Sequence, residues 1–119
     1  MNILLVEDEL LIQKSLKKML EKKGANVTVC SSGKDAIAKI STASYDRIIC
    51  DLMLQDITGF DVIEESKKFI ATDDIKNVFI IITAYTSQQV LEKAASYGCQ
   101  VIGKPFDDMK SVIQKFLTK

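Results

Sequence analysis

The residues that could do chemistry in this sequence are three acids, a hydroxyl and a lysine, each at or just beyond the end of an apolar run. Asp51 ends an Ile-rich run, and the pair Glu7-Asp8 follows an earlier run. Thr83 and Lys104 come at the ends of two later runs. A carboxylate, further acids, a hydroxyl and an ammonium group together suit phosphoryl transfer onto the carboxylate. The sequence therefore predicts a phosphate-handling site with Asp51 as its nucleophile.

The three acids also predict a metal site. Glu7, Asp8 and Asp51 repel one another if they converge, and either raised pKa values or a bound cation would relieve that repulsion. Oxygen ligands that are hard, few in number and open to water suit Mg²⁺, which keeps several waters and prefers one or two carboxylates plus a phosphate. We therefore expect Mg²⁺ as the cofactor.

A parallel sheet would bring these residues to one edge. Apolar runs predict strands at 2–6, 26–30, 46–50, 77–82 and 99–102, which alternate with five helices: 9–23, one after Gly33, one from Thr58, one from Thr86 to Gly98, and one from about Asp107. Strict alternation implies an α/β fold with helices on both faces of a five-stranded parallel sheet. The flavodoxin-like order 2-1-3-4-5 has its switch point between strands 1 and 3, which places Glu7 and Asp8 beside Asp51.

Helical spacing predicts which side chains these helices bury. The third helix would bury Val62, Ile63, Phe69 and Ile70, so we expect it to include Ile70. The fourth would bury Val90, Leu91, Ala94 and Ala95.

Length and composition suggest one domain over residues 1–119, because the chain is long enough for a single core. Its sixteen basic and sixteen acidic residues cancel, which disfavours direct nucleic-acid binding. No apolar run is long enough for membrane insertion, and the early acids do not suit a signal peptide, so we expect a cytoplasmic protein. Cys30, Cys50 and Cys99 lack metal-ligand spacing and are expected to be reduced core thiols.

Two other phosphate-handling patterns fit poorly. The segment from Gly98 to Lys104 matches most of a phosphate-binding loop, but Pro105 replaces the hydroxyl residue and the intervening residues suit a strand. Haloacid-type phosphatases carry a second acid two residues after their nucleophile, where this sequence has Met53.

Four motifs in order resemble the receiver domain of two-component response regulators, the CheY-like family. They are Val6-Glu7-Asp8, Asp51-Leu52-Met53, Ile82-Thr83-Ala84 and Lys104-Pro105-Phe106. The resemblance covers essentially the whole chain. It implies a single-domain receiver that takes a phosphoryl group from a histidine kinase or histidine phosphotransfer protein and passes the signal to a downstream protein.

The resemblance assigns a role to each matching residue. Asp51 would be the phosphoacceptor, and Asp8, Asp51 and the Met53 carbonyl would bind Mg²⁺, with Glu7 reaching the ion directly or through water. Thr83 and Lys104, with Ala84 beside them, would contact the phosphoryl group, and the Lys104–Pro105 peptide bond would be cis. Phosphorylation would shift a two-state equilibrium and remodel the face formed by helix 4, strand 5 and helix 5. Such a protein is no enzyme beyond its own phosphorylation and autodephosphorylation.

The sequence departs from the family pattern at Val101, where receivers usually carry Tyr or Phe. We therefore expect the Thr83 loop and helix 4 to carry the switch, with Tyr85 or Tyr97 as the interface aromatic. Met53 and Tyr85 flank the expected path of water to the phosphoryl group, so their bulk should prolong the phosphorylated state. Two alternatives stay open: a phosphorylation-independent interaction module with a vestigial site, and a receiver excised from a larger regulator or hybrid kinase.

Overall fold

The computed structural model describes residues 1–118 and contains the expected sheet. Its five strands pair in parallel in the order β2-β1-β3-β4-β5, so the predicted order 2-1-3-4-5 is confirmed. The strands are β1 (Asn2–Val6), β2 (Asn26–Cys30), β3 (Arg47–Asp51), β4 (Phe79–Thr83) and β5 (Gln100–Gly103). The central strands β3 and β4 are buried along their whole length, as expected for strands covered on both faces.

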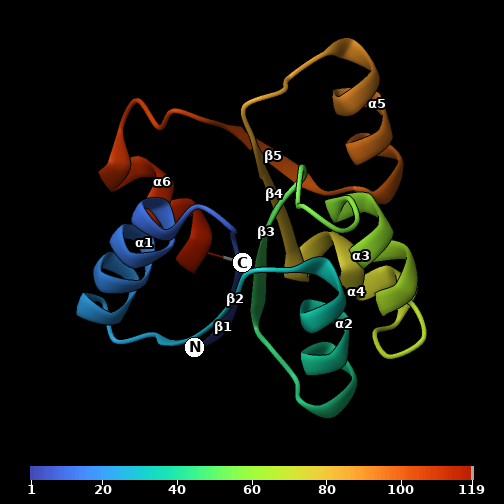
Figure 1. Ribbon diagram of the computed structural model, residues 1–119, viewed down its shortest axis with the longest axis horizontal. Coiled ribbons are helices and arrows are strands. Elements are labelled where there is room, and N and C mark those ends of the chain that lie inside the picture. Colours follow the sequence, from blue (N-terminus) through green and yellow to red (C-terminus); the bar gives the residue numbers. More distant parts are fainter. Residues whose placement is uncertain (119) are drawn as a thin grey trace.

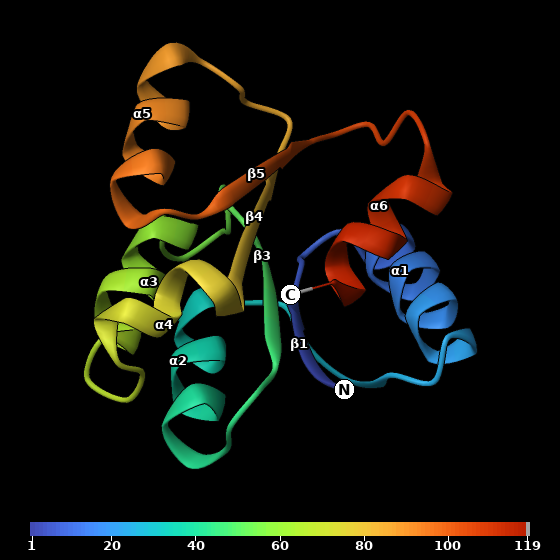
Figure 2. The ribbon, with the colours of Figure 1, turned by 180° about the vertical axis from the view of Figure 1, so that it is seen from behind.

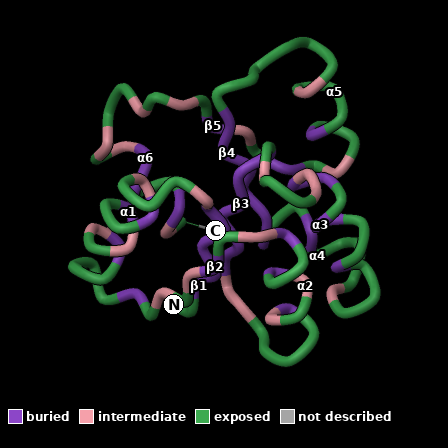
Figure 3. Tube along the Cα trace, in the orientation of Figure 1, coloured by how far each residue is buried: buried purple, intermediate pink, exposed green. Residues whose placement is uncertain are grey.

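Helices cover both faces of this sheet (Figure 1). They are α1 (Leu10–Lys22), α2 (Gly33–Thr42), α3 (Gly59–Ser66), α4 (Thr72–Val78), α5 (Gln88–Tyr97) and α6 (Met109–Leu117). Figure 2 shows α1 and α6 on one side of the sheet and the other four helices on the opposite side. Two apolar clusters follow from this arrangement, one under α1 and α6 and one under α2 to α5. Figure 3 shows the buried residues concentrated along the strands.

Local sequence signals fix where several helices begin and end. Thr58 and Asp61 form a reciprocal capping box at the start of α3, as the sequence predicts. The hydroxyl of Ser87 accepts a hydrogen bond from the Val90 amide at the start of α5. Gly98 ends α5 with φ +73°, a left-handed conformation that most residues avoid.

The segment between β3 and β4 differs from the sequence prediction. The predicted third helix would include Ile70, but α3 ends at Ser66 and a separate helix, α4, precedes β4. The Ser66 hydroxyl donates to the Ile63 carbonyl, a local bond that competes with helix continuation. Asp73 and Asp74 in the first turn of α4 favour a new helix start. The described chain therefore has six helices, where the sequence predicts five.

Three predicted core positions were also wrong. Phe69 lies in the loop between α3 and α4 and its exposed fraction is 50%, and that of Leu91 in α5 is 41%. Ala95 is exposed as well. In α5 only Ala94 is buried, so this helix rests on a narrower apolar stripe than the spacing predicts.

Arg47 anchors the beginning of β3 at the amino edge of the sheet. It is buried, and its guanidinium donates hydrogen bonds to the carbonyls of Phe116, Asn77 and Thr118. These carbonyls lie near the carboxyl ends of α6 and α4, where a positive charge is favourable. Arg47 thus ties the strand that carries Asp51 to two helices on opposite faces.

All three cysteines are free and buried, which confirms the expectation of reduced core thiols. None of the helices within residues 1–118 combines the length and the apolar character needed to cross a membrane.

Candidate functional site

The residues singled out by the sequence lie at the carboxyl edge of the sheet. Glu7 follows β1, Asp51 ends β3, Thr83 ends β4 and Lys104 follows β5. The parallel pairing places Asp51 across from Ile82, next to Thr83, and Thr83 across from Gly103. This edge lies at the switch point of the strand order, where open α/β sheets bind ligands.

The three acids come together as the sequence predicts. One carboxylate oxygen each from Glu7, Asp8 and Asp51 lies within 4.8 Å of the others, close enough to share a metal ion. Glu7 is fully buried and Asp51 nearly so, whereas Asp8 is partly exposed. The cluster therefore offers hard oxygen ligands with one side toward solvent.

Lys104 lies between two of these acids. Its Nζ is 2.9 Å from Oε1 of Glu7 and 3.1 Å from Oδ2 of Asp51. All three side chains are largely shielded from water, so each depends on the others for charge compensation. Lys104 thus binds Oδ2 of Asp51, the candidate nucleophile. The other oxygen, Oδ1, accepts a long hydrogen bond of 3.4 Å from the Met53 amide.

The electrostatic environment alters the pKa values of two of these groups. Burial raises the pKa of Glu7 to about 7, although hydrogen bonds from Lys104 and the Glu9 amide oppose the rise. Burial acts to lower the pKa of Lys104, but its bond to Glu7 and the charge of Asp51 outweigh burial and raise the pKa. Lys104 is therefore charged at neutral pH, whereas Glu7 is poised between its two protonation states.

A shallow pocket of about 370 Å³ opens over Asp51 and Lys104. Its lining also includes Asp8, Glu9, Met53, Gln55, Ala84 and Tyr85. Met53 and Tyr85 are among the exposed large apolar side chains, with exposed fractions of 51% and 61%. Both side chains line the pocket that contains Asp51.

Thr83 is buried, and its hydroxyl oxygen accepts a hydrogen bond from the backbone. The Tyr85 amide donates to Thr83 Oγ1 at 2.9 Å, and Thr83 is absent from the residues that line the pocket. The Lys104 amide donates to the Thr83 carbonyl at 2.8 Å, which joins the two loops. The bond from the Tyr85 amide uses an acceptor site of the hydroxyl, whose hydrogen is still available as a donor.

Of the remaining predicted positions, Pro105 follows β5 at this edge, whereas Val101 and Tyr97 lie farther from it. The Lys104–Pro105 peptide bond is cis, as predicted. Val101 lies in β5 across from Ile81, half-buried against the core under α5, and it lines a second surface pocket together with Thr86 and Phe106. Tyr97 is at the end of α5, where its hydroxyl donates to Glu64.

Sequence reasoning missed three residues that position the site. The buried Gln13 amide donates to the Glu7 carbonyl. Asp56 accepts hydrogen bonds from the backbone amides of Gly33 and Lys34, which fixes the loop after β3 to the start of α2. Gly59 lies so close to Asp51 that a Cβ there would be 2.8 Å from the Asp51 carbonyl oxygen. Only the turn signal Thr58-Gly59 was visible in the sequence.

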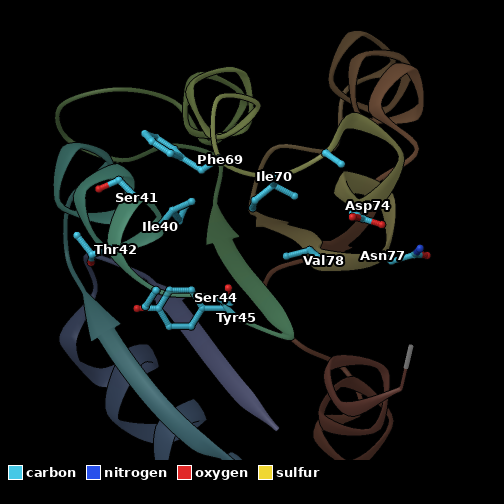
Figure 4. Close-up of a pocket in the computed structure, with 12 residues that line it drawn as sticks. Ile40, Ser41, Thr42, Ser44, Tyr45, Phe69, Ile70, Asp74, Asn77 and Val78 are labelled. Atoms are coloured by element: carbon cyan, nitrogen blue, oxygen red, sulfur yellow. The ribbon is translucent and has the colours of Figure 1, made fainter.

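A larger cavity of about 880 Å³ lies at the amino edge of the sheet (Figure 4). Figure 4 shows Phe69 and Tyr45 on opposite sides of it, with Ile40 between them and Ile70 to the right. Among the described residues that line it, Asp74 is the one with a charged side chain. The cavity therefore lacks the groups for the chemistry that the carboxyl edge can support.

Comparison with known proteins identifies the family. The sequence model described as "Response regulator receiver domain" matches residues 3–116. The chain belongs to this receiver family. Receiver domains are components of two-component signalling, and the CheY-like fold of this receiver agrees with that assignment.

Individual relatives show how far the likeness extends. This receiver is 26% identical over 120 residues to a probable transcriptional regulator, ycf29, of Pyropia yezoensis, an alignment that covers 98% of this chain and 53% of the relative. It is 30% identical over 118 residues to the aerobic respiration control sensor protein ArcB of Escherichia coli, which covers 98% of this chain and 15% of ArcB. The chain thus spans about half the length of the first curated relatives it matches, and less of ArcB.

A solved receiver structure is similar to this chain in its backbone fold. The receiver domain of the sensor histidine kinase PA1611 from Pseudomonas aeruginosa superimposes with a TM-score of 0.79 at 26% identity, covering 98% of this chain and 96% of that one. That structure is described as having a magnesium ion coordinated in its active-site cleft.

Proposed function

We propose that this chain is a phosphorylation-dependent receiver that accepts a phosphoryl group on Asp51 from a phosphohistidine. The donor would be a histidine kinase or a histidine phosphotransfer protein. The observation that carries the proposal is the placement of Asp51 in a solvent-open pocket, ion-paired to Lys104 and grouped with Glu7 and Asp8. A carboxylate in this setting is suited to attack on phosphorus.

The transfer itself needs few groups. An oxygen of Asp51 forms a bond to phosphorus while the bond between phosphorus and the histidine nitrogen breaks, and the imidazole keeps the electron pair and takes up a proton. Lys104 is within reach of the phosphoryl oxygens because its Nζ already lies 3.1 Å from Oδ2 of Asp51. Catalysis is then a matter of positioning and charge compensation, so the protein needs no separate general base.

The acid cluster fits Mg²⁺. Glu7, Asp8, Asp51 and the Met53 carbonyl would hold the ion, and the acids offer oxygens within 4.8 Å of one another in a pocket open to water. When bound, Mg²⁺ would neutralise negative charge on the phosphoryl oxygens. The magnesium described in the PA1611 receiver supports this assignment.

Thr83, Ala84 and Tyr85 form the proposed switch. A phosphoryl group on Asp51 offers new acceptors, and the Thr83 hydroxyl would move toward Asp51 and donate to one of them. The loop would follow and change the surface of α5, β5 and α6, which corresponds to the predicted helix 4, strand 5 and helix 5 because α4 is an additional helix. Val101 on that surface has no ring to reorient, so the Thr83 loop carries the signal to a downstream protein. In this proposal residues 1–119 act as one receiver domain, alone or within a larger regulator or hybrid kinase.

The switch can be tested with beryllofluoride, a mimic of the phosphoryl group, by amide NMR. With Mg²⁺ and beryllofluoride present, we expect the amides of Thr83, Ala84, Tyr85 and Lys104 to shift, with further shifts along α5 and β5. Mg²⁺ alone should shift only amides around Glu7, Asp8 and Met53. Asp51→Asn is the matched control and should abolish the beryllofluoride shifts.

The same experiment separates a second candidate, a vestigial interaction module, which the replacement of an aromatic by Val101 favours. Such a module would bind no beryllofluoride, or would bind it without shifts beyond the pocket. Either result would contradict the proposed switch.

A further inference from the structure

A groove between α1 and α6 lies apart from the Asp51 pocket and has its own chemistry. Its volume is about 440 Å³, and no residue that lines it also lines the Asp51 pocket. Met19, Ile113 and Leu117 supply its apolar surface, with Ile113 buried at the bottom and the other two half-exposed. The groove is therefore a concave strip between two helices with three apolar side chains on its surface.

Lysines border this strip on both sides. Lys22 and Lys23 come from the end of α1, and Lys110 comes from α6. All three are exposed, and among residues 1–118 none of them takes part in a salt bridge. Their charges are thus available to a partner.

The two helices on this face of the sheet, α1 and α6, carry more lysines than acidic residues. Helix α1 carries four lysines and one glutamate, and α6 carries two lysines and no acid, although the chain as a whole is neutral. The helices on the other face carry four lysines and seven acids. An interaction through the groove would therefore select strongly for negative charge.

The groove's shape and charge narrow the class of partner. A second copy packed through the same groove would bring like charges together, which opposes a symmetric dimer. Sites that bind single-stranded nucleic acid use aromatic rings or arginine to stack on the bases. Neither residue type is among the described residues that line the groove. A membrane requires an apolar surface that protrudes, whereas this one is recessed.

We propose that the α1–α6 groove is a docking site for an acidic amphipathic helix of a protein partner. Apolar side chains at i, i+3, i+4 and i+7 of such a helix would enter the strip over Ile113, and glutamates or aspartates flanking them would face Lys22, Lys23 and Lys110. This site shares no lining residue with the Asp51 pocket, so binding to the unphosphorylated protein tests it separately from phosphoryl transfer.

The probe is a fluorescein-labelled synthetic peptide of about 18 residues, with leucines along one helical face and glutamates along its flanks. Fluorescence anisotropy measures its affinity for the whole chain at low and at physiological salt. A second peptide has the same composition in scrambled order, so it keeps the charge but loses the apolar face. We expect the ordered peptide to bind at least about tenfold more tightly than the scrambled one.

Charge reversal locates the binding. The double variant Lys22→Glu/Lys110→Glu should weaken binding of the ordered peptide at least about tenfold, and Lys34→Glu, an exposed lysine on α2, should change it less than about twofold. Circular dichroism confirms that each variant folds. The proposal would be overturned if the protein bound neither peptide or bound the two peptides equally. It would also be overturned if the ordered peptide bound equally to Lys22→Glu/Lys110→Glu and to Lys34→Glu, or if the protein preferred phosphatidylglycerol vesicles to the peptide.

Discussion

Replacing Gly59 by alanine should disturb Asp51 through its backbone. A Cβ at Gly59 would be 2.8 Å from the Asp51 carbonyl oxygen and 3.2 Å from both the Leu52 Cα and the Ile81 Cδ1. Two of these neighbours are backbone atoms in or next to a buried central strand, so they have little freedom to retreat. The strain should therefore displace the strand end that carries the candidate nucleophile.

The magnitude follows from two opposing effects. Overpacking at a well-packed position costs about 1–3 kcal/mol. Alanine is a better helix former than glycine by up to about 1 kcal/mol, and Gly59 is the first residue of α3, where that gain is incomplete. We therefore expect Gly59→Ala to lower the free energy of unfolding by about 1–2 kcal/mol.

Urea denaturation followed by circular dichroism measures this loss, and Gly103→Ala is the matched control. A Cβ at Gly103 would meet Thr86 Cγ2 at 3.4 Å and the Thr83 carbonyl oxygen at 3.9 Å, which are ordinary contacts. That variant should be neutral or gain up to about 1 kcal/mol from reduced freedom of the unfolded chain. If Gly59→Ala is as stable as Gly103→Ala, the proposed close packing against Asp51 is wrong.

Three further predictions concern the acid cluster, the amino edge and the pocket rim. In chelated buffer, stability should fall as pH rises from about 5 to 8, because the folded state with the Glu7 pKa raised from 4.5 to about 7 binds more protons than the unfolded state. Glu7→Gln should flatten that slope in urea titrations at several pH values, and an unchanged slope would exclude Glu7 as its cause. Arg47→Met should lower the free energy of unfolding by about 2–4 kcal/mol, because three carbonyls lose their charged donor; Lys39→Met on the surface of α2 is the control, and equal losses would argue against the anchor. Tyr85→Ala should shorten the lifetime of the phosphorylated protein, measured by intact mass over time, because it opens the pocket to water; an equally fast decay in both proteins would refute a shielding role.

Much of the fold follows from local patterns in the sequence. Apolar runs that alternate with segments of helical spacing predict the five strands. Their order is also predictable, because right-handed crossovers allow few strand orders in a parallel sheet. The gathering of Glu7, Asp8 and Asp51 then follows from their positions at strand ends. These inferences depend only on periodicity and on the geometry of parallel sheets.

Features that depend on tertiary contacts could not be predicted in this way. The split between α3 and α4 reflects a hydrogen bond from Ser66 and a second helix start, and the apolar residues Phe69 and Ile70 obscured it. The bond from Gln13 to the Glu7 carbonyl joins residues whose side chains give no shared sequence signal. The hydrogen bond that the Thr83 hydroxyl accepts from the Tyr85 amide likewise depends on a loop conformation that composition does not reveal.

The most direct test of the central claim is the intact mass of the protein after incubation with acetyl phosphate and Mg²⁺. We expect a gain of one phosphoryl group, located on Asp51 by peptide mapping, and no gain in Asp51→Asn or when the metal is chelated. If the wild-type protein gains nothing, it should next be given a phosphorylated histidine phosphotransfer protein as donor. Failure with both donors in folded, Mg²⁺-containing samples, or a phosphoryl group on any residue other than Asp51, would contradict the account.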